Sequence, residues 1–283
     1  MTAESVAAAL REARALGVDR LDAQLLLGQV LGRSRAWLIA HDDAAMAPAD
    51  AAAFARLAER RAAGEPLAYL LGEREFHGLA LAITPAVLVP RPDTETLVDW
   101  ALRLLHAPPL AQVAAPAVVD LGTGSGAIAL AIKASSRATV WAVERSPQAL
   151  AVARRNASEL GLDVHFAQGD WWQALEGRLD APAAFDLVVG NPPYIAPGDP
   201  HLAALSHEPI AALVAEDEGL ADIARIAQGA PARLRTGGWL LLEHGWEQAP
   251  AVAAILARAG LVDVQTVADI EGRPRCTGGR LPR

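Results

Sequence analysis

Four consecutive residues, Asn191-Pro192-Pro193-Tyr194, are the segment of this chain best suited to chemistry. They follow an apolar, strand-like run over residues 185–189, with Gly190 as the break. Two prolines in a row hold φ near about −65° and supply no N–H donor, so the turn is stiff and its carbonyl oxygens have set directions. Asn191 adds a side-chain acceptor, and Tyr194 adds a flat aromatic face with a polar tip. Such acceptors suit a planar NH2 group, whose delocalised lone pair they could localise toward an electrophile.

A glycine-rich loop upstream predicts the binding of a nucleoside. The β-branched run Val118-Val119 ends at Asp120 and leads into Gly122-Thr123-Gly124-Ser125-Gly126, which an apolar helical pattern follows. In such a strand, turn and helix, the missing Cβ atoms let the backbone approach a ligand closely. The next strand, residues 139–143, ends at Glu144, and an acid about 20 residues past the loop can bind both ribose hydroxyls. The loop serves dinucleotides and S-adenosylmethionine (AdoMet) alike, and with Ala127 it also satisfies the relaxed dinucleotide fingerprint.

The glycine loop, the acid and the Asn-Pro-Pro-Tyr turn together resemble AdoMet-dependent methyltransferases that modify planar nitrogens. More narrowly, the chain resembles the PrmC/HemK family, the protein-glutamine N5-methyltransferases of peptide-chain release factors. The further segments that carry this resemblance are Glu65 to Gly72, Phe76, Val89 to Glu95, Gly169-Asp170-Trp171, Glu208-Pro209 and Leu241 to Gly245. The similarity runs from about Leu21 to about Gly272, which is nearly the whole chain.

The resemblance implies methyl transfer from AdoMet to the glutamine of the Gly-Gly-Gln loop of class 1 peptide-chain release factors. It implies that the cofactor is bound by Gly122, Thr123, Gly124, Ser125 and Gly126 at its methionyl part, Glu144 at the ribose, Asp170 and Trp171 at the adenine, and Asn191. Catalysis and substrate binding are expected from Asn191, Pro192, Pro193 and Tyr194. In that scheme the Asn191 side chain and the Pro192 carbonyl hold the two amide protons, and Tyr194 packs against the amide plane.

Hydrophobic patterning predicts two domains. Residues 1–75 have helical spacing, with a helix expected over residues 48–63, and are interpreted as a small helical bundle that recognises the substrate. Residues 76–90 suggest a short hairpin linker, and residues 91–283 form the AdoMet-binding domain. Asp93 or Thr94 is expected to cap the helix whose apolar periodicity starts at Leu97.

Beyond residue 93, strand and helix patterns alternate, which predicts an open, mostly parallel α/β sheet of the class I (Rossmann-like) type. Further strands are expected over residues 164–166, 185–189 and 239–242. Residues 262–267 and the extreme C-terminus could supply antiparallel edge strands. Because ligands lie at the carboxyl ends of strands in such sheets, Asp120, Glu144, Asp170 and Asn191 should share one rim.

Composition excludes several other classes. The net charge of −8 and the pI of about 5.4 do not indicate a nucleic-acid groove, so no direct nucleic-acid partner is expected. The single cysteine, Cys276, rules out an intrachain disulfide, and the seven histidines show no metal-ligand spacing, so no metal is expected. No apolar stretch reaches the roughly 18 residues of a membrane span, and Met1 to Ala9 lack a secretory pattern. A cytoplasmic location is therefore expected. The protein is also expected to be a monomer, although composition does not determine this.

Other functions remain open at this level. An N6-adenine methyltransferase acting on DNA or RNA would use the same planar NH2 chemistry, but it needs a target-recognition domain or a basic groove. A nicotinamide-dependent oxidoreductase would need a proton donor after the fourth strand, where Asn-Pro-Pro-Tyr offers none suited to neutral pH. A binding module with a vestigial cofactor site would contradict the intact loop, acid and turn.

Overall fold

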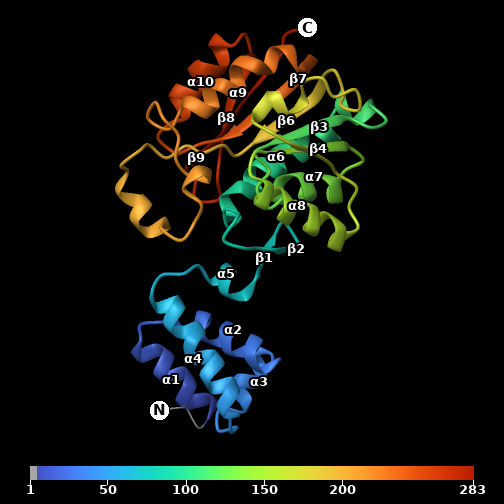
Figure 1. The fold of residues 1–283 in the computed structure, drawn as a ribbon. Helices are drawn as coiled ribbons and strands as arrows, with labels where there is room; N and C mark the ends of the chain where they lie inside the picture. The colour runs from blue at the N-terminus through green and yellow to red at the C-terminus, as the bar shows by residue number, and fades with distance from the viewer. Residues whose placement is uncertain (1–4) are drawn as a thin grey trace. The chain divides into compact units, whose positions relative to one another are not determined.

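The computed structural model describes residues 5–283, which divide into two compact units on either side of the Glu73–Arg74 bond (Figure 1). Residues 74–90 therefore belong to the larger unit, whereas the sequence suggested a boundary after residue 75 and a separate linker. The hairpin expected there consists of β1 (Glu73–Phe76) and β2 (Leu79–Ala82). Residues 1–4, where the expected domain and the segment inspected for a signal begin, lie outside the described residues. Over the described part of the chain, no helix has the length and apolar character to cross a membrane.

The smaller unit is a helical bundle. Its helices are α1 (Val6–Ala15), α2 (Arg20–Leu31), α3 (Arg35–Ala40), α4 (Pro48–Ala62) and α5 (Leu67–Leu71). The side chains of Ser5, Asp19 and Ser34 accept hydrogen bonds from the first turns of α1, α2 and α3, which satisfies N–H groups that have no partner within the helix. Leu27 and Phe54 lie in its buried core. The predicted helix over residues 48–63 is confirmed as α4.

The larger unit contains a seven-stranded sheet with the order β5-β4-β3-β6-β7-β9-β8. The strands are β3 (Ala117–Leu121), β4 (Thr139–Glu144), β5 (His165–Gln168), β6 (Phe185–Gly190), β7 (Leu234–Glu243), β8 (Val262–Ala268) and β9 (Pro274–Arg280). The first five in the order are parallel, and β9 runs antiparallel to both β7 and β8. The predicted class I fold is thus confirmed, with β8 at the edge and the C-terminal strand β9 inserted beside β7.

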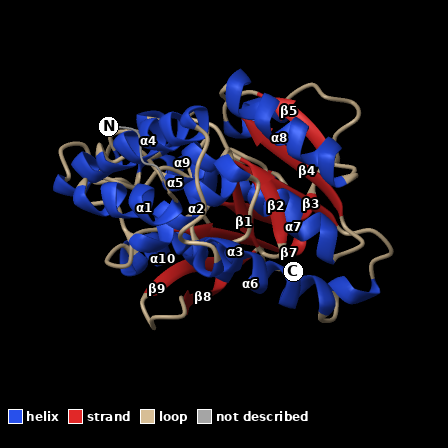
Figure 2. Cartoon of the chain, turned by 90° about the horizontal axis from the view of Figure 1, so that it is seen from below, coloured by secondary structure: helices blue, strands red, loops and turns tan. Residues whose placement is uncertain are grey.

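Helices cover both faces of this sheet (Figures 1 and 2). One layer holds α6 (Glu95–His106), α7 (Ala127–Ser135) and α8 (Pro147–Leu160), and the other holds α9 (Ala221–Gly229) and α10 (Ala249–Arg258). Short 3-10 turns complete the unit: η1 (Pro92–Thr94), η2 (Leu110–Gln112), η3 (Trp171–Leu175), η4 (Pro200–Leu205), η5 (Ile210–Ala212) and η6 (Ala230–Ala232). Because both faces are covered, every residue of β3 and β6 is buried, which explains why these strands are apolar except for Asp120 and Asp186.

Strand order places the glycine-rich loop after β3 next to the Asn-Pro-Pro-Tyr turn after β6. Leu121, the last residue of β3, pairs with Val143 of β4 on one side and with Gly190 of β6 on the other. Strands β4 and β5 lie on one side of β3, and β6 and β7 lie on the other. Such a switch point between β3 and β6 opens a crevice at the carboxyl ends of the strands. A Cβ atom on Gly190 would lie 2.9 Å from the Leu121 carbonyl oxygen, so this close pairing requires glycine.

Candidate active site

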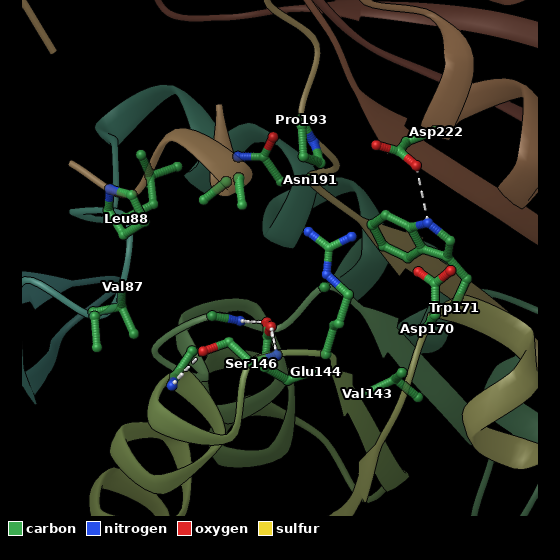
Figure 3. A pocket seen from close by; sticks show the side chains of 18 of the residues that line it. Val87, Leu88, Val143, Glu144, Ser146, Asp170, Trp171, Asn191, Pro193 and Asp222 are labelled. Atoms are coloured by element: carbon green, nitrogen blue, oxygen red, sulfur yellow. Dashed lines mark hydrogen bonds between the residues drawn. The ribbon is translucent and has the colours of Figure 1, made fainter. Parts of the chain in front are cut away.

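A cavity of about 220 Å³ opens at the carboxyl ends of β3, β4 and β6 (Figure 3). Figure 3 shows Asn191 and Pro193 on one side of it and Glu144 and Ser146 on the other, with Trp171, Asp170 and Asp222 nearby. The residues predicted from the sequence that line it are Gly122, Gly124, Glu144, Asp170, Trp171, Asn191 and Pro193. Of the four strand-end groups expected at one rim, Glu144, Asp170 and Asn191 line this cavity, whereas Asp120 is fully buried and does not.

Glu144 orders the glycine loop and keeps acceptor capacity for a ligand. Its Oε2 accepts from the Gly124 amide at 3.0 Å and its Oε1 accepts from the Ser146 amide at 2.8 Å. Each carboxylate oxygen retains a second lone pair, so the group can still accept from vicinal hydroxyls. Gly124 has φ of 56°, and a Cβ there would meet nothing within 4 Å, so the loop is open at this point.

The remaining loop residues point into the scaffold rather than lining the cavity. The Thr123 hydroxyl donates to Asp120 Oδ2 at 2.6 Å, and Asn156 Nδ2 donates to the Ser125 carbonyl at 2.8 Å. Gly126 occupies the N-cap position of α7. Burial raises the pKa of Asp120 to about 7, because this fully buried carboxylate has lost its hydration. These residues hold the loop in shape behind its ligand-facing glycines.

An indole and a carboxylate form another wall. A Cβ on Gly122 would lie 3.0 Å from the Trp171 ring, so the ring covers the start of the loop. Trp171 Nε1 donates to Asp222 Oδ1 at 3.0 Å, which fixes the ring from α9. Asp170 Oδ2 accepts from Arg225 at 2.6 Å, also on α9. Trp171 and Asp170 both border the cavity. The Trp171 ring offers a flat apolar face to a nucleoside base, and the Asp170 carboxylate offers a hydrogen-bond acceptor.

The Asn-Pro-Pro-Tyr turn is anchored from behind. Asn191 Nδ2 donates to Thr94 Oγ1 at 3.3 Å, which leaves Oδ1 available to accept from a ligand. The Tyr194 carbonyl accepts from Gln248 Nε2 at 3.0 Å, and the Tyr194 hydroxyl donates to Glu243 Oε1 at 3.3 Å. Burial, reinforced by the negative charge of Glu243, raises the pKa of Tyr194, so the phenol stays protonated.

The prediction that the side chain of Asp93 or Thr94 caps α6 is wrong. Thr94 does stand at the N-cap position of α6, but its side chain makes no cap hydrogen bond and instead accepts from Asn191. Asp93 pairs with Arg275 at 3.0 Å. The preceding 3-10 turn η1 leaves Thr94 in a helical conformation, so its hydroxyl is turned away from the first amides of α6.

A second cavity, of about 230 Å³, lies on the other side of Asn191 and is lined by Arg91, Pro192 and Tyr194. Leu88, Asn191 and Ala212 border both cavities. Glu208, which is buried, accepts from the Val89 amide at 3.1 Å and from the Arg91 guanidinium, so it ties residues 89–91 to the loop that follows the turn. Asn191 therefore lies at the border of two adjoining cavities.

Sequence reasoning missed several site residues. Arg145 and Ser146 line the first cavity. They directly follow Glu144 in the sequence, and this position next to a strand-end acid could have identified them. Asp222 and Arg225 lie on α9, and nothing in the sequence connects that helix to the site. Glu243 follows a predicted strand and could have been found by the same strand-end argument. Within residues 5–283, no three His, Cys, Asp or Glu side chains gather as metal ligands.

Comparison with known proteins gives a family. The model of the PrmC N-terminal domain matches residues 4–72, and that of the methyltransferase small domain matches residues 94–212. A structure of a methyltransferase from Pyrococcus furiosus aligns with a TM-score of 0.52 at 16% identity, covering 73% of this chain and 90% of that one. The structure titled delta-N METTL16 MTase domain aligns with a TM-score of 0.54 at 19% identity, covering 72% and 89%. These two likenesses concern the fold.

Sequence relatives are much more similar. A release factor glutamine methyltransferase from Bordetella pertussis is 52% identical over 94% of this chain and 96% of its own length. Those from Burkholderia pseudomallei and Escherichia coli are 50% identical over 99% of both chains and 43% identical over 96% of both chains. With this identity over nearly the full length, and with the glycine loop and the Asn-Pro-Pro-Tyr turn facing one cavity, the chain belongs to the family of release factor glutamine methyltransferases.

Proposed function

We propose that this protein transfers a methyl group from AdoMet to the side-chain amide nitrogen (N5) of the glutamine in the Gly-Gly-Gln loop of class 1 peptide-chain release factors. The observation that carries the proposal is the position of Asn191 between two adjoining cavities. One cavity carries the nucleoside-binding groups, and the other is walled by the rigid turn that suits a planar amide. The methyl donor and the acceptor then meet at Asn191.

The residues of the first cavity fit AdoMet. Glu144 offers acceptors for the ribose hydroxyls, Trp171 and Asp170 offer a face and an acceptor for adenine, and the open side of the loop at Gly124 leaves room for the methionyl part. In bound AdoMet the sulfonium supplies an electrophilic methyl group. These residues bind and orient it, and proximity of this kind can contribute about 7–11 kcal/mol in well-aligned systems.

The residues of the second cavity hold the acceptor amide. Asn191 Oδ1 and the Pro192 carbonyl accept its two protons, and Tyr194 packs against its plane. The nitrogen lone pair forms the new N–C bond while the C–S bond breaks, and the sulfur keeps that electron pair. The extra proton on nitrogen passes to solvent. No general base is required. Tyr194 does not act as one, because burial raises its pKa and its hydroxyl donates to Glu243.

A labelling experiment tests the proposal. The purified protein is incubated with methyl-labelled AdoMet and one of three acceptors: a class 1 release factor, the same factor with its Gly-Gly-Gln glutamine changed to alanine, or DNA. Label in the intact factor alone supports glutamine methylation. Label in DNA would support the N6-adenine alternative instead, and equal label in both protein forms would move the acceptor to another side chain.

The cellular setting belongs to the same proposal. Release factors act in translation, so we place the enzyme in the cytoplasm as a monomer that contacts the factor without a direct nucleic-acid partner. The net charge of −8 supports the absence of a direct nucleic-acid partner. Sedimentation of the enzyme alone and with the factor would test both the monomer and the complex.

A further inference from the structure

The loop that follows the Asn-Pro-Pro-Tyr turn forms a wall of both cavities. It spans residues 196–213 and is closed at its base by Ile195, whose amide donates to the Leu213 carbonyl at 2.9 Å. Pro209 and Ala212 line the first cavity, and Ala212 and Leu213 line the second. The position of this loop therefore affects the shape of both cavities.

Residues 86–91 form another wall of the same two cavities. Leu88 borders both of them, and Arg91 borders the second. The segment continues to Thr94, whose hydroxyl accepts from Asn191 Nδ2 at 3.3 Å. This wall is therefore connected through three further residues to the side chain at which the two cavities adjoin.

A buried carboxylate joins the two walls. Of residues 196–212, all of which the structure describes, Glu208 alone is buried, and its side chain is only 3% exposed. Its Oε2 accepts from the Val89 amide at 3.1 Å, and its Oε1 accepts from the Arg91 guanidinium. Both carboxylate oxygens are thus paired with groups of the other wall. Because an unpaired charge is costly to bury, Glu208 can stay buried only while residues 89–91 remain in place against it.

We propose that Glu208 is a positioning residue that fixes the two walls at the separation from which the methyl donor and the acceptor amide meet at Asn191. The inference rests on the proposed function, and it assigns to Glu208 no contact with either substrate. The turns η4 and η5 of the loop contain no buried residue, so little apolar surface holds the middle of the loop in place. Loss of the Glu208 bonds therefore lets this wall move outward. A misplacement of about 1 Å can lower a rate by about 10²-fold, so a small movement is enough to affect turnover.

The first test is kinetic and uses Glu208→Gln, which keeps the size of the side chain but removes its charge and one of its two acceptor oxygens. We expect kcat at saturating release factor to fall roughly ten- to a hundredfold, with only a few-fold change in the AdoMet dissociation constant. Asp199→Asn is the matched control, because this acid of the same loop bonds to His201 within the loop. Its kcat should stay close to that of the wild type. A wild-type kcat in Glu208→Gln, or an equal loss in Asp199→Asn, would overturn the inference.

The second test needs no methyl acceptor, so its outcome is independent of the proposed function. In protein labelled with 15N-valine, hydrogen exchange is followed at the Val89 amide, whose resonance is assigned by its loss in Val89→Ile. We expect this amide to exchange at least roughly tenfold faster in Glu208→Gln, because its bond to a charged acceptor is weakened. The amides of Val118 and Val188, in the buried strands β3 and β6, should keep their wild-type rates.

Two results of the exchange experiment would overturn the positioning role. An unchanged rate at Val89 would mean that Glu208 does not hold this wall, and faster exchange at all three valines would mean that it only supports the fold. If the exchange is as expected but the wild-type protein leaves the release factor unmethylated, the proposed function fails while the connection between the two walls stands.

Discussion

Replacing Asn191 by alanine removes the acceptor that the two cavities share. In the folded protein the change deletes the donor bond to Thr94 at 3.3 Å and the free Oδ1. The structural loss is one neutral hydrogen bond at a half-buried position, worth about 0.5–1.5 kcal/mol of folding stability. The turn itself should persist, because its two prolines and the Gln248 bond to the Tyr194 carbonyl remain. The variant therefore tests chemistry more than folding.

The expected kinetic effect is large because the lost contact is preorganised at the reacting atoms. Removing one such contact in other enzymes lowers kcat by about 10²–10³-fold, or about 2.7–4 kcal/mol of barrier. AdoMet affinity should fall much less, since Glu144, Trp171 and the glycine loop still line the first cavity. We therefore expect a drop in kcat of at least roughly a hundredfold with only a few-fold change in the AdoMet dissociation constant.

The assay is a single-turnover reaction with labelled AdoMet and saturating release factor, paired with calorimetric titration of AdoMet. Asn191→Asp is the matched control, because it keeps oxygen acceptors at the same place while losing the donor to Thr94. Its rate should lie between those of the wild type and Asn191→Ala. Unchanged turnover in Asn191→Ala, or a loss confined to AdoMet binding, would refute the role of Asn191 as the amide acceptor.

Three further changes probe the cofactor cavity and its support. Glu144→Ala should weaken AdoMet binding by roughly 10- to 100-fold, as expected for lost hydrogen bonds to a charged group, with a smaller change in kcat at saturation; titration calorimetry measures it. Gly122→Ala places a methyl 3.0 Å from the Trp171 ring at a φ of 78°, so it should lower stability by about 1–2 kcal/mol and weaken AdoMet binding; denaturant unfolding and titration measure both. Asp120→Asn should increasingly stabilise the protein as pH rises from 5 to 8, because a carboxyl whose folded pKa is raised to about 7 contributes stability at low pH that is lost through that pKa. Thermal unfolding of both proteins across this range measures the difference.

Each of these has a result that would contradict it. Normal AdoMet affinity in Glu144→Ala would mean that the carboxylate serves only the Gly124 and Ser146 amides. A Gly122→Ala protein with wild-type stability and binding would show that Trp171 yields without cost. A stability difference for Asp120→Asn that stays constant with pH would mean that Asp120 is ionised throughout, with the hydrogen bond from Thr123 sufficient to compensate its burial.

Much of the fold followed from local patterns. Residues 118–121 and 185–189 are apolar except for Asp120 and Asp186, because both faces of their strands are buried. The alternation of strand and helix patterns predicted the parallel sheet. The antiparallel strands expected over residues 262–267 and at the C-terminus are confirmed as β8 and β9. Their order across the sheet was not predicted, because β9 pairs with the distant strand β7 and leaves β8 at the edge. The boundary near residue 74 depended on which unit the hairpin packs with, and hydrophobic periodicity carries no such information.

For the site, the sequence by itself determined the rigid turn at residues 191–194, the glycine loop and the strand-end acid Glu144, since each depends on short-range geometry. Tertiary structure alone decided the partners. The chain brings Thr94 to Asn191 across 97 positions and Glu243 to Tyr194 across 49, and these distances are set by strand order rather than by motif. It also turned Thr94 from an expected helix cap into a contact of Asn191. A hydroxyl or carboxylate takes its hydrogen-bond partners from whatever folding places within about 3 Å, and no local pattern specifies that neighbour.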